Sequence, residues 1–260
     1  MNAVRWENSR GICGVSKRID FSNFRESKSN TGHYASINSL SLSSDSDQKW
    51  WSSSSDDHSV CLWSSYSASG SAAIAKFASH SCAVYASEFL GEENLISAGH
   101  DGRLFCHNLN TLQSTHVSTV DSAINSLTVV SATTLVAGTQ NGYILLNDLR
   151  QQGGMVFHYS PFEITSVACR PTFQYQIATG TTGMGVAVLD IRYSHQNTKE
   201  SSSVFMVPRK HTHVTGVSWH SSGDRILATE VGLCPSVYYY NGTVTTLENA
   251  TFKNRATFKR

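Results

Sequence analysis

A segment of eight residues recurs along this chain at nearly regular intervals, and this repeat constrains the fold more than any other feature. Each copy opens with a turn-forming residue, continues as an apolar run and ends in Ser, Asn or Asp. The copies are DHSVCLWS (57–64), DGRLFCHN (101–108), NGYILLND (141–148), GMGVAVLD (183–190) and CPSVYYYN (234–241). Successive copies lie about 40–45 residues apart, which is the length of a four-stranded repeat unit. Only the last interval is longer, and it contains a polar, serine-rich insertion at Tyr193 to Ser203.

The apolar runs of the chain are short and end at residues that favour turns. Ile37 to Leu42, Val60 to Trp63 and Tyr143 to Leu146 are examples, each rich in aliphatic, β-branched or aromatic residues. Runs of this length are typical of strands. Apolar residues nowhere recur at helical spacing over three turns, so the pattern predicts an all-β protein. Together with the repeat length, this predicts a β-propeller of about five recognisable blades.

The repeats predict three segments. Residues 32–251 hold the blades, with repeats that end near positions 64, 108, 148, 190 and 241. Residues 1–31 form a polar N-terminal arm, and residues 252–260 resemble the start of a further, truncated repeat. Propellers remove exposed strand edges by closing into a ring. Because five repeats followed by the start of a sixth would leave strand edges exposed, we expect an incomplete propeller that is open or irregularly closed.

The first repeat resembles the WD-repeat family most fully. Gly32 and His33 open it, Ser53 and Asp57 flank the inner hairpin, and Trp63 stands at the tryptophan position of that family. The resemblance implies a buried structural relay in which Asp57 holds His33, and the imidazole connects to Ser53 and to the Trp63 indole. Such a network is tolerated in a core only when every polar group has a partner.

The later repeats retain only part of this pattern. His80, Ser97 and Asp101 are kept in the second repeat, but His107 replaces the tryptophan. The fifth repeat has Glu230 and Cys234 at the serine and aspartate positions when it is aligned at 234–241.

Charge and composition exclude several classes of partner. The chain has 20 Lys plus Arg against 19 Asp plus Glu, a net charge of +1. We therefore expect no direct binding of nucleic acid, which needs clustered basic residues. No apolar run approaches the roughly 20 residues that span a bilayer, so we expect no membrane insertion. Met1 to Arg18 is too polar for a signal peptide, which predicts an intracellular protein of the nucleus, the cytoplasm or both.

Two consecutive repeats end in the same short motif. Asn147-Asp148-Leu149-Arg150 is followed by Leu189-Asp190-Ile191-Arg192, so an Asp-x-Arg box closes both repeats. Here the chain resembles the WD-repeat substrate receptors of cullin-4 ubiquitin ligases, which dock on the damage-specific DNA-binding protein adaptor. The resemblance implies that Arg150 and Arg192 contact this adaptor, and that Asp148 and Asp190 complete the adaptor-binding boxes by orienting the turn. The alternative is an exposed turn with a surface salt bridge, worth at most about 1 kcal/mol.

The resemblance predicts a non-catalytic receptor or scaffold subunit whose protein substrate the sequence does not identify. The rival hypothesis is a general WD-repeat scaffold that binds peptides or histone tails without any ligase. An enzyme is disfavoured because the chain has no G-x-S-x-G nucleophile elbow. No metal site is predicted, because His211, His213 and His220 have no companion ligand at a suitable spacing and are expected to be structural. No cofactor is expected either.

Overall fold

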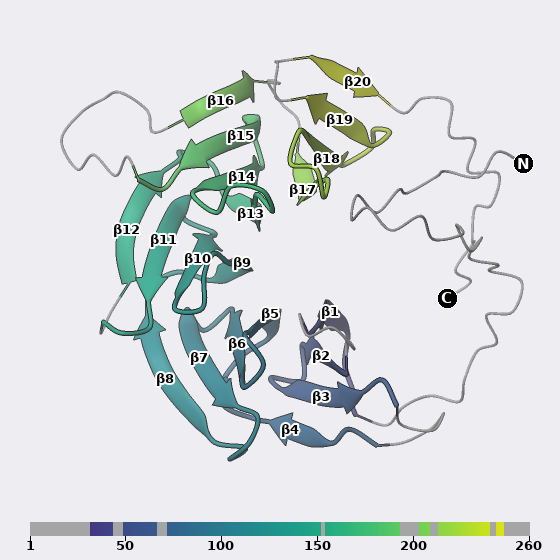
Figure 1. Cartoon of the computed structure of the whole chain (residues 1–260), viewed down its shortest axis with the longest axis vertical. Coiled ribbons are helices and arrows are strands. Elements are labelled where there is room, and N and C mark those ends of the chain that lie inside the picture. Colours follow the sequence, from purple (N-terminus) through teal and green to yellow (C-terminus); the bar gives the residue numbers. More distant parts are fainter. Residues whose placement is uncertain are drawn as a thin grey trace, which may run out of the picture. The chain divides into compact units, whose positions relative to one another are not determined.

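The computed structural model describes residues 32–43, 49–66, 72–151, 154–192, 203–208, 213–239 and 243–246. Over these ranges the chain forms twenty β-strands, β1 to β20 (Figure 1). None of the described residues belongs to a helix that is long and apolar enough to cross a membrane. The predicted polar arm (1–31), most of the predicted insertion (193–202), His211 and the predicted further repeat (252–260) lie outside the described ranges.

The strands form five sheets of four strands, and neighbours in each sheet are consecutive in the sequence. We name these sheets blades 1 to 5. Blade 1 contains β1 (Ile37–Leu42), β2 (Trp50–Ser55), β3 (Val60–Ser64) and β4 (Ala75–Phe77). Blade 2 contains β5 (Val84–Leu90), β6 (Asn94–Gly99), β7 (Arg103–Asn108) and β8 (Ser114–Thr119). Blade 3 contains β9 (Ile124–Val129), β10 (Thr134–Thr139), β11 (Tyr143–Asp148) and β12 (Gly154–Tyr159). Blade 4 contains β13 (Ile164–Cys169), β14 (Gln176–Thr181), β15 (Gly185–Asp190) and β16 (Ser203–Pro208). Blade 5 contains β17 (Val214–Trp219), β18 (Arg225–Glu230), β19 (Ser236–Tyr239) and β20 (Val244–Thr246).

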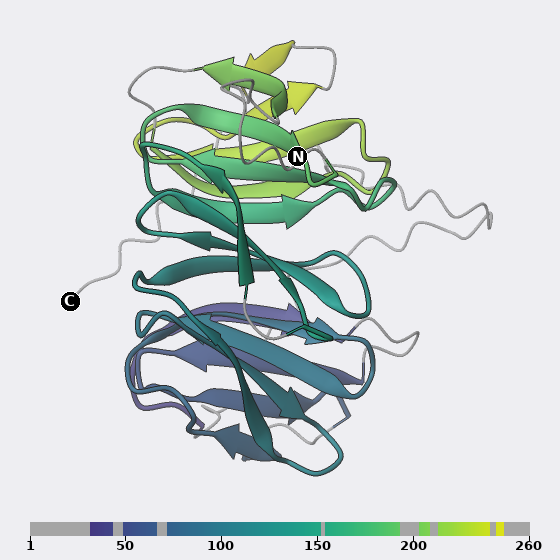
Figure 2. The same cartoon turned by 90° about the vertical axis from the view of Figure 1, so that its left-hand side faces the viewer.

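The predicted all-β fold of about five propeller blades is confirmed over the described residues. Each blade is a twisted sheet, as the side view shows (Figure 2). The repeated eight-residue segments contain the third strand of each blade and the turn before it. In blades 1, 2 and 3 this turn has a positive φ at His58, Gly102 and Gly142, respectively. Glycine adopts this conformation readily, so the Gly-containing copies of the repeat suit the turn well.

One part of the sequence alignment is wrong. The alignment of the fifth repeat at 234–241 places Tyr240 at the tryptophan position. In the structure Ile226 pairs with Tyr238 across β18 and β19, just as Trp51 pairs with Trp63 across β2 and β3. Tyr238 therefore occupies the tryptophan position, twelve residues after Ile226, just as Trp63 lies twelve residues after Trp51. The sequence alignment of this repeat is therefore two residues out of frame, because strand pairing, and not residue type, sets which residues are equivalent.

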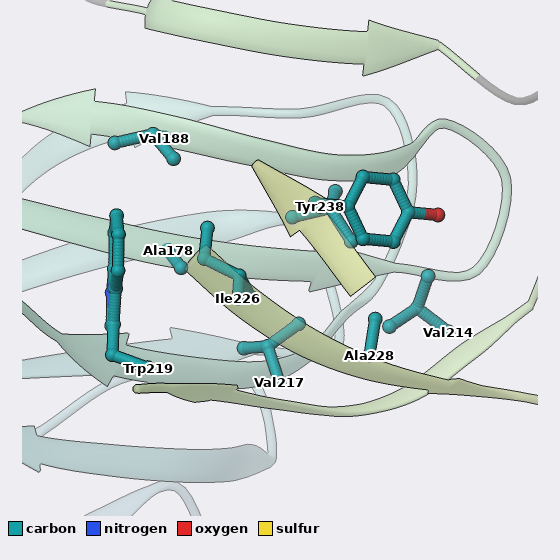
Figure 3. Close-up of a cluster of buried hydrophobic side chains, with 9 residues drawn as sticks. Ala178, Val188, Val214, Val217, Trp219, Ile226, Ala228 and Tyr238 are labelled. Carbon is teal, nitrogen blue, oxygen red and sulfur yellow. The ribbon is translucent and has the colours of Figure 1, made fainter. Parts of the chain in front are cut away.

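The chain divides into two compact units, and blade 3 contributes to both. The first unit holds residues 1–137 and 146–155, and the second holds 138–145 and 156–260. In the first unit β5 packs against β1 and β2, around a core that includes Val60, Leu62, Phe77, Val84, Phe89 and Leu95. In the second unit blades 4 and 5 share a core of buried side chains, with Trp219 and Tyr238 the largest among them (Figure 3).

Strand β1 presents an apolar face that its counterpart β5 buries. Ile37, Leu40 and Leu42 are 54%, 68% and 57% exposed. The equivalent positions of β5, by their pairing with the second strand, are Val84, Ser87 and Phe89. These are at most 5% exposed, and Ser87 Oγ lies 3.1 Å from Ser52 Oγ of blade 1. An uncovered first strand is consistent with an incomplete propeller.

Candidate functional site

The four predicted relay residues of blade 1 lie in one chain of hydrogen bonds. His33 Nδ1 lies 3.0 Å from both carboxylate oxygens of Asp57, and His33 Nε2 lies 2.8 Å from Ser53 Oγ. The Trp63 indole N–H donates to the same Ser53 Oγ at 2.8 Å. Ser59 Oγ and Lys76 Nζ also donate to Asp57. The network ties the turn before β3 to the segment that precedes β1.

These contacts determine the charge on Asp57. Burial by itself raises the pKa of this carboxyl, but hydrogen bonds from Ser59, Lys76 and His33 outweigh burial, and the pKa lies well below its usual range. Asp57 is therefore ionised at all physiological pH values. Sequence reasoning missed Lys76, because its place beside Asp57 depends on the pairing of β4 with β3.

Blade 2 contains a second relay that ends differently. His80 Nδ1 lies 3.0 Å from Asp101 Oδ1, and His80 Nε2 lies 2.8 Å from Ser97 Oγ. Ser97 Oγ lies 2.7 Å from Nε2 of His107, which takes the tryptophan position. The chain then continues to Ser114 Oγ, 2.7 Å from His107 Nδ1. His107 is fully buried and stacks on Phe77 at 4.5 Å between ring centroids.

Blade 5 replaces the relay with a buried pair. The Tyr238 hydroxyl donates to Glu230 Oε1 at 2.6 Å, and both residues are buried. The relays and this pair connect strands within a blade, so they stabilise the scaffold and offer nothing to a partner.

The two Asp-x-Arg boxes adopt the same local conformation. In each, the aspartate is the last residue of the third strand, and its Oδ1 accepts the backbone N–H of the arginine at 3.0 Å. Arg150 Nε and Nη2 donate to Asp148 at 3.0 and 2.7 Å. Arg192 Nε and Nη2 donate to Asp190 at the same distances. The aspartate thus orients both the turn and the guanidinium.

The hydrogen bonds of the boxes keep both aspartates ionised. The hydrogen bond from the Arg150 side chain lowers the pKa of Asp148 to about 2, and the corresponding bond from Arg192 lowers the pKa of Asp190. The two boxes differ in exposure. The side chain of Arg150 is 72% exposed and that of Arg192 is 46% exposed, while Asp148 and Asp190 are 22% and 3% exposed. Both arginines therefore reach solvent in a defined orientation.

The surroundings of Arg192 were not foreseen from the sequence. Its guanidinium lies over the rings of Phe173 and Tyr175, at 5.0 and 5.2 Å from their centroids. Both aromatic residues belong to the connection between β13 and β14. Nothing in the repeat pattern marks them, because connections between strands vary freely in length and composition.

The described residues hold no group of three or more His, Cys, Asp or Glu side chains that could bind a metal ion. Of the histidines weighed as ligands, His213 is exposed, and His220 Nδ1 lies 2.6 Å from Ser222 Oγ.

Comparison with known proteins agrees with the fold. Residues 25–64 match the WD40 family model, described as the WD domain, G-beta repeat. The match ends at the last residue of β3, so it covers β1 to β3 and the four relay positions of blade 1. A search of curated proteins found no significant match.

Proposed function

Because the chain is a WD-repeat protein, whose blades form a protein-interaction scaffold, we propose that it serves a cullin-4 RING ubiquitin ligase as a non-catalytic substrate receptor. It docks on the damage-specific DNA-binding protein adaptor through Arg150 and Arg192. The observation that carries the proposal is that the third strands of two consecutive blades end in the same Asp-x-Arg box, with both arginines exposed and held by the same three hydrogen bonds. An incidental surface turn has no reason to be built twice in this way.

The boxes supply chemistry suited to a protein interface. A guanidinium is planar and always charged, and it binds carboxylate or carbonyl oxygens with several donors at once. Asp148 and Asp190 fix each guanidinium before binding, which reduces the conformational entropy lost on docking. Ubiquitin transfer belongs to other subunits, and this chain positions the substrate.

Within the receptor family the proposal is narrower. The segments Gly32 to Tyr34, Gly185 to Arg192 and Thr215 to His220 resemble cullin-4-associated factor five. This resemblance supports the ligase link and leaves the protein substrate undefined.

The test is direct binding between the purified full chain and the purified adaptor. We expect the double variant Arg150→Glu, Arg192→Glu to bind at least about 30-fold more weakly, since charge reversal at interface arginines typically removes 2 kcal/mol or more. Arg225→Glu is the matched control, because Arg225 is also an exposed arginine that contacts a neighbouring carboxylate, Asp224. Equal binding of wild type and double variant would refute docking through the boxes.

The same experiment separates the rival function. A general scaffold that binds peptides or histone tails predicts no binding of the adaptor by the wild-type chain, whatever the buffer.

A further inference from the structure

The two boxes have different neighbours, and the difference lies in one connection between strands. Backbone hydrogen bonds define equivalent positions: Ile191 N donates to Tyr175 O, and Leu149 N donates to Thr133 O, both at 2.8 Å. Tyr175 of blade 4 therefore corresponds to Thr133 of blade 3. In blade 4 the connection between the bonded residues Arg170 and Gln176 has five residues, 171–175. In blade 3 the connection between Val130 and Thr134 has three, 131–133.

The longer connection brings two aromatic side chains to Arg192. Phe173 and Tyr175 pack edge to face, with ring centroids 5.8 Å apart, and remain 36% and 48% exposed. The Arg192 guanidinium lies over both rings and is fixed at its Nε and Nη2 by Asp190. The equivalent connection of blade 3, Ser131-Ala132-Thr133, has no aromatic residue. We call Phe173, Tyr175 and Arg192 the aromatic platform.

We infer that the aromatic platform is the anchor of the docking surface, with Phe173 and Tyr175 as contact residues and Arg150 as a secondary contact. The inference rests on the proposed function, because it takes the adaptor as the partner. Arg, Tyr and Phe held rigidly together have the composition and pre-organisation of interface hot spots. Arg150 has the same hydrogen bonds, but Thr133 stands at the position of Tyr175 and offers its guanidinium no ring.

The platform also defines the chemistry of the surface that binds it. Arg192 and Asp190 are ionised together, so the pair carries no net charge and does not require an acidic partner. The exposed parts of the two rings favour an aliphatic side chain, and the guanidinium favours a carbonyl oxygen beside it. The surface that fits is a protein loop offering one aliphatic side chain next to a backbone carbonyl.

The experiment measures the affinity of the full chain for the purified adaptor at 0.1 and 0.5 M salt. We expect the double variant Phe173→Ala, Tyr175→Ala to bind about 10- to 30-fold more weakly, as the loss of two cation–π partners and their contact area predicts. This loss persists at high salt, because the platform is not a free charge. Tyr175→Phe keeps the ring and binds within about twofold of wild type, whereas a purely structural role of the tyrosine hydroxyl predicts a loss.

Thr133→Ala, at the equivalent position of blade 3, is the matched control and is expected to bind within about twofold of wild type. We expect the variants to remain folded, because both rings are partly exposed, and thermal unfolding checks this. If the wild type binds the adaptor and the double variant Phe173→Ala, Tyr175→Ala binds equally well, this inference is overturned and the proposed function stands. No binding by the wild type overturns both. Binding of an oligouridine probe that the double variant abolishes also overturns it, because the platform would then stack bases.

Discussion

The relays of blades 1 and 2 share a histidine, a serine and an aspartate, but they differ at their inner end. Blade 1 ends at Trp63 and blade 2 ends at His107. An indole can only donate a hydrogen bond, whereas a neutral imidazole donates with one nitrogen and accepts with the other. This single replacement determines whether the inner end of the relay can bind an added proton.

Blade 1 has one consistent order of hydrogen bonds. Trp63 donates to Ser53 Oγ, Ser53 donates to His33 Nε2, and His33 Nδ1 donates to Asp57. No group beyond the indole can reverse this order. With its imidazole neutral, the network is therefore a strut with a single order of hydrogen bonds.

Blade 2 has two consistent orders. With both imidazoles neutral, Ser114 donates to His107, His107 to Ser97, Ser97 to His80, and His80 to Asp101. One added proton reverses the first three bonds and leaves His80 charged beside the Asp101 carboxylate. The network can take up a proton without losing a hydrogen bond, so what limits its uptake is burial of the charge. The comparison teaches that a relay ending in histidine contains a second buried group that acid can charge, whereas a relay ending in tryptophan does not.

The largest expected effect comes from removing the buried carboxylates. Asp57→Ala should cost about 3–5 kcal/mol, because it leaves the donors of His33, Ser59 and Lys76 without their acceptor in a buried site. Asp101→Ala should cost less, since two of its donors, Ser81 and the Arg103 backbone, are in exposed contacts that water can replace. Hydrogen exchange by mass spectrometry, resolved blade by blade, measures both, with the exposed Asp121→Ala as control. Equal losses of stability in the two variants would show that the aspartate ends of the two relays, Asp57 and Asp101, are equivalent.

The next effect is acid sensitivity confined to blade 2. Burial, with a smaller contribution from the charge of His80, lowers the pKa of His107 to about 3 from an ordinary 6.5. Burial also lowers the pKa of His80. The nearby Asp101 carboxylate opposes this decrease, and the positive charge of Arg103 adds to it. A histidine with a depressed pKa loses stability as pH falls from 6.5 towards its folded value, because only the unfolded chain binds the proton. At pH 4.5 His107 alone should cost about 2–3 kcal/mol.

Blade 1 behaves differently in this range, because the lowered pKa of Asp57 affects stability only below about 4. We expect exchange in β6 and β7 to increase between pH 6.5 and 4.5, after correction for intrinsic rates, while β2 and β3 remain protected. His107→Gln keeps one donor and one acceptor but cannot be charged, so it should remove most of the pH dependence. Trp63→His should introduce a dependence in blade 1. A blade 2 as acid-stable as blade 1 would show that burial does not keep the proton off His80 and His107 in the folded state.

The sequence predicted what depends on local pattern and missed what depends on register. Turn residues and alternating apolar runs locate each third strand, and Asp57 could be paired with His33 because the repeat fixes both. Ser114 joins His107 only through the pairing of β7 with β8, which no motif encodes. The aromatic platform could not be predicted, because the position of Phe173 beside Arg192 depends on how the longer connection between β13 and β14 folds. The fifth repeat was misaligned by two residues because three consecutive tyrosines, 238–240, give no unique register, so the alignment gave Tyr240 where pairing gives Tyr238.

The serines of the two relays allow a subtler test of the same difference. Ser53→Ala leaves the Trp63 indole N–H buried without an acceptor, and it should cost about 1–3 kcal/mol. In Ser97→Ala each imidazole can change tautomer and keep its bond to Asp101 or Ser114, so we expect a cost of about 1 kcal/mol or less. Local exchange protection at pH 7.5 provides both values. A greater cost for Ser97→Ala would show that blade 2 cannot rearrange its protons.

The smallest effect concerns Lys76, which only blade 1 adds to its relay aspartate. The ammonium lies 3.0 Å from Asp57 Oδ2, and its side chain is 38% exposed. Lys76→Met should cost less than about 1 kcal/mol, because solvent screens a pair with one exposed partner and the methionine keeps the aliphatic contacts. The loss should shrink further at 0.5 M salt in the wild-type background. It should grow in Ser59→Ala, where Lys76 and His33 are the two side chains left to compensate the buried carboxylate. If Lys76→Met costs as much as Asp57→Ala, the strut of blade 1 depends on its ion pair, and the contrast between tryptophan and histidine is not what separates the two blades.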